Sequence, residues 1–480
     1  MKSSDFVAQS ARSFNMELLL IAFVPAILVW GSIAAVRVSV VTLAALFMVA
    51  TSCLPAEFFS VRAGGLSWTI DRVVLIALLG AFCLGLKKRK VQVLPLETID
   101  YIAIIFFAWL SFRTFTQPLG SIHKLQPHTL MHLINGYLVP LIVYFVVRST
   151  RLDRKDLRIA FWITTLTGLY LSFTAVCEVG KIWSLVYPKF ISDPTLSIHF
   201  GRARGPMLQS VRLGVCLLAS LSIIGVYSVW LNPQSKARWL FALATVPALT
   251  VAIMVTYTRS IWMGLIAVSL LTVVLCLQGR IRRFFLVGGA MAGILGGLII
   301  GPHLVAFKRE YSAAETREST YMRAAFAYVS VEMIKERPIA GYGFNQFNVA
   351  NLPFLSDRST DIRLESIRGY VHHNSYLSLI VDLGIVGFTL YSLVIIGWLR
   401  ESWRVWNAEA MPRWARGLGF VAICVTSVHL IQMAFHEVSF SSIENGLVYV
   451  CFGAVMAVKR QFLAQDDRSV SANHPHPTHP

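Results

Sequence analysis

The sequence has few charged residues for its length. They fill 14% of its 480 positions, whereas 56% are apolar; soluble domains carry about 25% charged residues. A soluble protein of this composition would lack the polar side chains needed to cover its surface. The shortage excludes an ordinary soluble enzyme, a disordered protein and a secreted disulfide scaffold.

Paired cysteines and acidic residues are also scarce. None of the seven cysteines forms a CxxC pair, and all lie in or beside apolar runs, so we expect them to pack as small apolar side chains. Only 25 acidic residues oppose 43 basic ones. In a soluble protein this excess would indicate nucleic-acid binding, but membrane proteins gather Lys and Arg in their cytoplasmic loops. We therefore expect no nucleic-acid partner.

What the sequence does have is a series of apolar runs near 20 residues in length, the length that spans a bilayer. They predict an all-α, polytopic membrane bundle of about 12–13 transmembrane helices with one large periplasmic loop. The runs lie at 16–35, 39–57, 69–86, 101–117, 131–148, 159–178, 208–231, 239–257, 260–278, 284–301, 376–398, 417–435 and 444–458.

Basic clusters separate the runs, and two runs lie between each cluster and the next. Every cluster therefore falls on one face of the membrane, which the positive-inside rule makes cytoplasmic. The clusters lie at 87–90, 148–158, 236–238, 280–283, 400–416 and 459–460; the outward loops are then 118–130, 179–207, 257–260, 302–375 and 436–443. The N-terminal orientation stays open, because three preceding runs would place Met1 outside, whereas Lys2 and Arg12 favour the inside.

These assignments divide the chain into four parts. We expect N-terminal transmembrane helices over 1–301, a large periplasmic loop over 302–375, C-terminal transmembrane helices over 376–458 and a disordered cytoplasmic tail over 459–480. The loop is too long to be a plain connector. Its residues 314–336 predict an amphipathic surface helix that ends before Pro338, followed by a tight turn at 341–343.

Three polar segments are expected at outer membrane ends: 201–206, 256–260 and 372–376. Arg259 is the most informative residue in them, since about 40 residues around it are otherwise uncharged. An ionisable group at such a depth is costly and marks a functional site by default. The alternative is an arginine that snorkels to the lipid headgroups.

The residue types in these segments fit one chemistry. Guanidinium groups match the oxygens of a phosphate or diphosphate, and a histidine with a near-neutral pKa can take a proton from a hydroxyl. Together they would suit a lipid diphosphate donor and an alcohol acceptor. Alternatively, either His372 or His373 has only a structural role.

Four short motifs recur in the order of a known family. They are Thr256–Leu265, Glu336–Gly343, His373–Leu377 and Gly384–Gly387. The chain resembles the bacterial O-antigen ligase and O-antigen polymerase superfamily over roughly 200–400. Such proteins are metal-independent, cofactor-free, inverting glycosyltransferases of the bacterial inner membrane, which act at the periplasmic face on glycans carried by undecaprenyl diphosphate.

The resemblance also implies site residues. Arg259 would hold the donor diphosphate, and Arg202 would match the arginine of an Arg-x-x-Gly element, with Arg204 as its rival because residues 205–209 depart from the family pattern. His373 would be the catalytic histidine. We further expect Arg204, Asn374, His372, Tyr257, Gly341 and Arg323 to bind substrate, and we expect no metal ligands.

The resemblance leaves the acceptor open, since ligases, polymerases and protein glycosyltransferases share this donor. Expected partners are the undecaprenyl-diphosphate-linked glycan, a glycan or lipid A–core acceptor, membrane lipids and other polysaccharide assembly proteins. Two alternatives from other classes are a lipid-linked glycan flippase and a non-catalytic assembly subunit. A flippase would be expected to carry polar residues at mid-membrane and two related halves, and the sequence shows neither pattern.

Overall fold

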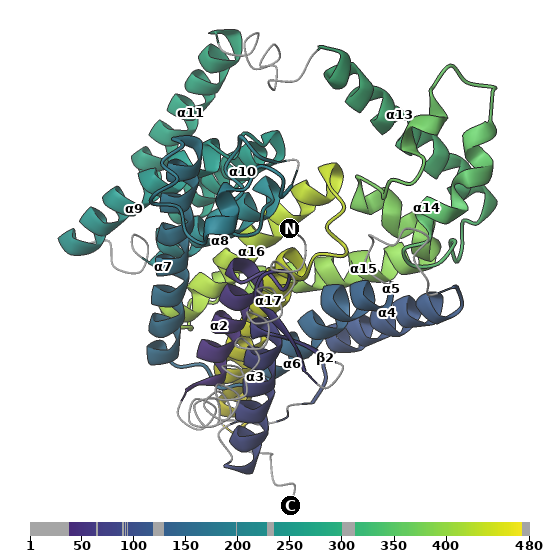
Figure 1. Cartoon of the computed structure of the whole chain (residues 1–480). Coiled ribbons are helices and arrows are strands. Elements are labelled where there is room, and N and C mark those ends of the chain that lie inside the picture. The colour runs from purple at the N-terminus through teal and green to yellow at the C-terminus, as the bar shows by residue number, and fades with distance from the viewer. Residues whose placement is uncertain are drawn as a thin grey trace, which may run out of the picture.

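The computed structural model describes residues 38–63, 66–88, 91, 93, 95–118, 129–197, 199–227, 235–299 and 313–472. This part of the chain is an assembly of helices (Figure 1) with one short hairpin, in which β1 (Ser60–Ala63) pairs with β2 (Leu66–Thr69). The predicted all-α membrane bundle is confirmed. The predicted run at 16–35 lies outside the described residues.

Within the described ranges, eight helical segments are long and apolar enough to cross a membrane. They are α4 (Thr98–Phe115), Thr129–Arg148, α7 (Arg154–Val179), α9 (Lys236–Met254), α10 (Arg259–Cys276), α15 (Ser375–Asn407), α16 (Arg413–Phe435) and the first part of α17 (Ser442–Ala472). The segment Thr129–Arg148 joins α5 (Thr129–Leu133), a π-helical turn (Ile134–Leu138) and α6 (Val139–Arg148).

The remaining predicted runs also form helices. The shorter apolar helices are α2 (Val40–Cys53) and α8 (Ser210–Gly225), whereas α3 (Ile70–Lys87) and α11 (Gly279–Ile299) coincide with the runs at 69–86 and 284–301. Helix α17 continues to Ala472, past residue 459 where the tail was predicted to begin. Residues 473–480 lie outside the described part.

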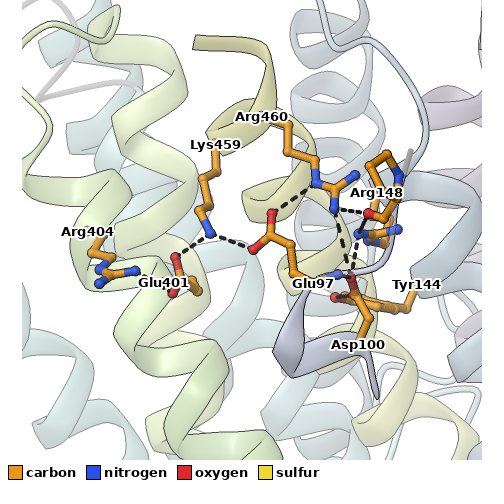
Figure 2. Close-up of polar contacts among 9 residues, drawn as sticks. Glu97, Asp100, Tyr144, Arg148, Glu401, Arg404, Lys459 and Arg460 are labelled. Atoms are coloured by element: carbon orange, nitrogen blue, oxygen red, sulfur yellow. Dashed lines mark hydrogen bonds and ion pairs between the residues drawn. The ribbon is translucent and has the colours of Figure 1, made fainter. Parts of the chain in front are cut away.

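Basic clusters from distant parts of the sequence meet at one end of the bundle, as Figure 2 shows for α4, α6, α15 and α17. Lys459 of α17 lies 2.6 Å from a carboxylate oxygen of Glu97 and 2.8 Å from one of Glu401. Below this pair, the fully buried Asp100 accepts hydrogen bonds from Arg148 and from the Tyr144 hydroxyl. Buried ionic groups need such partners, and here the pairs join the four helices.

The loop between α11 and α15 folds around a small apolar core that is separate from the main core of the bundle. Its main helix, α13 (Ala313–Glu336), agrees with the predicted 314–336, and it packs near the start of α15 together with α14 (Phe347–Ala350) (Figure 1, upper right). Two short 3₁₀ helices follow at Leu352–Ser356 and Leu364–Ile367. This core joins Val381 of α15 to nine residues of the loop: Ala325, Phe326, Val329, Met333, Tyr342, Phe347, Leu355, Leu364 and Ile367.

Helix α15 is broken at Gly384, where φ is +67°. The break frees backbone groups that bond to residues 338–343: Ile385 N–H donates to Pro338 O (2.8 Å), and Tyr342 N–H donates to Val381 O (2.8 Å). From α4, Arg113 donates to the carbonyls of Ala340 and Gly341, each at 2.9 Å. The loop is thereby fixed to the membrane bundle.

We expect Gly384→Ala to destabilise the protein by about 3 kcal/mol, from the positive φ and from overpacking. A Cβ atom there would lie 2.0 Å from the carbonyl oxygen of Ile339. The measurement is the melting temperature in detergent. Gly80→Ala is the matched control, because a Cβ at this helical glycine would meet nothing within 4 Å. Equal melting temperatures for the two variants would contradict the role of the break.

Candidate functional site

Arg259 is the first residue of α10, at the junction with α9. Tyr257, two residues earlier, turns the chain with a φ of +47°. The side chain of Arg259 is exposed. A helix N-terminus carries a partial positive charge and free N–H groups, so a guanidinium placed there adds a second attraction for an anion.

The start of α10 is fixed to the end of α16. The Ser260 hydroxyl lies 3.0 Å from Nε2 of His436, and the Gln432 side chain donates to Ser260 O at 3.0 Å. Ser260 and Gln432 are buried. The backbone that carries Arg259 is therefore held against residues 432–436.

The start of α15 is fixed to the same segment. Asn374 caps the helix by accepting from Leu377 N–H at 3.1 Å, and its amide donates to Ala434 O at 3.1 Å. The Ser375 hydroxyl lies 2.9 Å from His436 O, and it accepts from Val438 N–H at 2.8 Å. Because α10 and α15 begin against one segment, Arg259 and His373 come to the same end of the bundle.

The third predicted segment reaches the α9–α10 junction through its backbone, since Ala203 N–H donates to Val255 O at 3.1 Å. Arg204 is fully buried and pairs with Glu178 of α7 at 3.3 Å. Its other nitrogens donate to loop carbonyls, among them Ile191 O at 2.8 Å. Arg204 thus holds the loop between α7 and α8 together, and these contacts give it a structural role.

Arg202 is in a different environment from Arg204. Its side chain is only partly buried, and its Nη2 lies 2.7 Å from Nδ1 of His199. It belongs to the same segment that Ala203 ties to α9. Of the two arginines, Arg202 is therefore the one whose side chain reaches solvent.

The adjacent histidines also differ. His372 is buried, accepts from Asn374 N–H at Nδ1 (3.1 Å) and lies 2.6 Å from the Ser330 hydroxyl through Nε2. Because that hydroxyl donates to Phe326 O at 2.6 Å, Nε2 of His372 carries the proton. The pKa of His372 is lowered to about 3, mainly because the side chain is buried and to a lesser extent because of the nearby charge of His373. His372 is a neutral, fixed link between α13 and α15.

His373 is exposed to solvent, and one side of its ring packs near Phe326, with the centroids 5.3 Å apart. This partial burial and the nearby charge of Arg323 lower the pKa of His373 below its usual value. Arg323 lies on α13 with its side chain exposed. At neutral pH His373 is therefore an uncharged imidazole that can accept a proton.

Gly341, predicted to bind substrate, has a packing role. Its φ is +67°, and a Cβ there would lie 2.5 Å from Val381 O. Close backbone approach to α15 therefore requires glycine at this position.

Two ionisable residues of this region, His436 and Glu437, were missed by the sequence reasoning. Glu437 accepts from Ser439 N–H at 3.0 Å and lies 3.1 Å from the Ser375 hydroxyl; burial raises its pKa. The signal was present, because these two adjacent ionisable residues lie in the short outward loop predicted between the last two apolar runs. In the described residues no group of three or more His, Cys, Asp or Glu is placed to hold a metal ion.

The comparison with known families covers this region. A family model described as O-antigen ligase matches residues 243–392, which include Arg259, Arg323 and His373. No curated protein matches the chain. The match supports a membrane glycosyltransferase of O-antigen ligase type in a broad sense. Together with the helical membrane bundle it confirms the resemblance drawn from the short motifs: over residues 243–392, this multi-pass membrane protein is similar to the O-antigen ligase family.

Proposed function

We propose that the protein transfers a glycan from an undecaprenyl-diphosphate carrier to a hydroxyl acceptor at the periplasmic face of a bacterial inner membrane. The acceptor is a glycan or lipid A–core, and the reaction is inverting and metal-independent. The observation that carries the proposal is that α10 and α15 both begin against residues 432–438, which brings Arg259 and His373 to one end of the bundle.

Arg259 and Arg202 bind the donor diphosphate. Their forked donors match its oxygens, and the N-terminus of α10 adds the partial charge of its free N–H groups. As the bond between the anomeric carbon and the diphosphate oxygen breaks, negative charge grows on the leaving group. Fixed cations stabilise that charge in the transition state.

His373 acts on the acceptor. The acceptor hydroxyl attacks the anomeric carbon from the side opposite the diphosphate, and its proton passes to the neutral imidazole. Undecaprenyl diphosphate leaves, and one glycosidic bond replaces one phosphoester bond to the sugar. No nucleotide is consumed, because the donor already carries a good leaving group.

Arg323 tunes His373 in this proposal. Its positive charge disfavours the imidazolium and so lowers the pKa of His373. The base consequently stays unprotonated, and active, to a lower pH than an ordinary histidine would. Asn374, Ser375 and His436 hold the histidine backbone in place.

We expect Arg323→Gln to raise the pKa of His373 and to move the acidic limb of the pH–rate profile to higher pH. Activity would then be lost sooner as the pH falls, with little change at alkaline pH. The measurement is kcat against pH with purified protein. Arg363→Gln is the control, because Arg363 is another exposed arginine of the same loop. An unshifted acidic limb in Arg323→Gln would contradict the assignment of His373 as the base.

The function is tested by incubating purified protein with an undecaprenyl-diphosphate-linked oligosaccharide and candidate acceptors in the presence of EDTA. The expected result is a longer or newly attached glycan and released undecaprenyl diphosphate. Donor movement across a vesicle without a covalent product would identify a flippase instead. No product from wild-type protein, with product appearing only when another protein is added, would identify a non-catalytic subunit.

A further inference from the structure

A cavity of about 960 Å³ lies between the first turns of α7, α9 and α16. These are the ends opposite the candidate site, which gathers at the last residues of α9 and α16. Helix α9 has 19 residues and α16 has 23; at 1.5 Å per residue their two ends are roughly 30–35 Å apart. The cavity is therefore distinct from the proposed donor site.

Positive charge surrounds this cavity. Its lining includes five cationic side chains, and none of them forms an ion pair with a carboxylate in the described part of the chain. Asp153 lies nearby but caps the start of α7 by accepting from Asp156 N–H at 2.7 Å, and neither aspartate lines the cavity. The five cations are Arg154, Lys155, Arg158, Arg238 and Arg413.

The deeper wall is aromatic. Phe161 packs near Tyr227 and Phe241, with ring centroids 6.1 and 6.3 Å apart, and the Tyr227 hydroxyl donates to Trp414 O at 3.0 Å. Trp162 completes the wall. Aromatic rings with a polar edge collect where a membrane meets water, so the cavity combines a charged rim with an apolar interior at that depth.

The membrane-facing surface continues the apolar wall. On the helices that form the cavity, Leu166 is 62% exposed, Leu240 66% and Leu243 71%. In a membrane-spanning bundle such side chains contact acyl chains. A ligand with a negative head and apolar chains therefore matches the site better than a free anion does.

We propose that this cavity binds the phosphate headgroup of an anionic phospholipid, with its acyl chains along α7 and α9. Basic pockets between transmembrane helices at the cytoplasmic side suit such headgroups. The proposal rests on the cavity and on the membrane location, and it stands independently of the proposed glycan transfer.

The test compares full-length wild-type protein with the variant Arg154→Gln/Arg158→Gln/Arg413→Gln. Each protein in detergent is titrated with dioleoylphosphatidylglycerol, dioleoylphosphatidylcholine or inorganic phosphate, while bound lipid is counted by native mass spectrometry and the melting temperature is recorded. The control is Lys87→Gln/Lys88→Gln/Arg400→Gln, which removes the same charge from three exposed cations elsewhere.

We expect wild-type and control proteins to bind phosphatidylglycerol in preference to phosphatidylcholine and to melt at a higher temperature with it. The cavity variant should bind it about 100-fold more weakly. Each of the three cations contributes about 1 kcal/mol, and a tenfold change in affinity corresponds to about 1.4 kcal/mol. Equal phosphatidylglycerol binding by the cavity and control variants would overturn the proposal. So would equal binding of phosphatidylcholine, or the same stabilisation by phosphate alone.

Discussion

Replacing His373 by glutamine is expected to lower the rate of glycan transfer by about 10²–10⁴-fold, the usual contribution of a general base. The glutamine amide cannot take the acceptor proton. The side chain is partly exposed and its ring contacts Phe326, so the protein should still fold. The measurements are kcat with a purified lipid-linked donor and the melting temperature of the same preparation.

His372→Gln is the matched control for this prediction. His372 is buried and links Ser330 to Asn374, so its loss should lower the melting temperature by several degrees and reduce activity mainly through unfolding. The two variants would thus differ in the quantity that changes: His373→Gln lowers kcat at an unchanged melting temperature, whereas His372→Gln lowers the melting temperature. If His372→Gln abolished kcat at full stability while His373→Gln stayed active, the assignment of the base would be reversed.

Arg259→Lys is expected to lower kcat by about 10²–10³-fold, the magnitude found when one preorganised donor to a developing anion is removed. Lysine keeps the charge but cannot present two parallel N–H groups to a diphosphate. Arg259→Ala should be worse, because it also removes the charge. The measurement is kcat and KM for the donor, with membrane insertion checked by the yield of folded protein.

The control for Arg259 is Arg400→Lys, an exposed arginine on α15 near the opposite end of the bundle. It should leave both kinetic constants unchanged. Wild-type turnover by Arg259→Ala would favour the alternative in which this arginine only snorkels to lipid headgroups.

Much of the bundle follows from the sequence, because burial in lipid requires long apolar helices whatever their partners are. The spacing of the basic clusters also predicts which helix ends meet, and the contacts of Lys459 with Glu97 and of Arg148 with Asp100 agree with it. The break at Gly384 could not be foreseen in the same way. Its backbone groups are satisfied by residues 338–343, and that pairing exists only in the folded chain.

The candidate site, too, can be predicted from the sequence only in part. Arg259 stands out from the sequence because about 40 residues around it are otherwise uncharged, and His373 stands out through its resemblance to the family motif at His373–Leu377. The difference between Arg202 and Arg204 depends on Glu178, which lies 26 residues before Arg204. The part played by His436 depends on Ser260 and Ser375. Local patterns carry no information about such distant partners.

The central claim is that Arg202, Arg259 and His373 surround one diphosphate site. It is tested most directly by determining an experimental structure of the protein with undecaprenyl diphosphate bound. The account predicts diphosphate density at the start of α10, in contact with the guanidinium groups of Arg259 and Arg202 and facing His373. Diphosphate density in the basic cavity between α7, α9 and α16, with the start of α10 unoccupied, would contradict it.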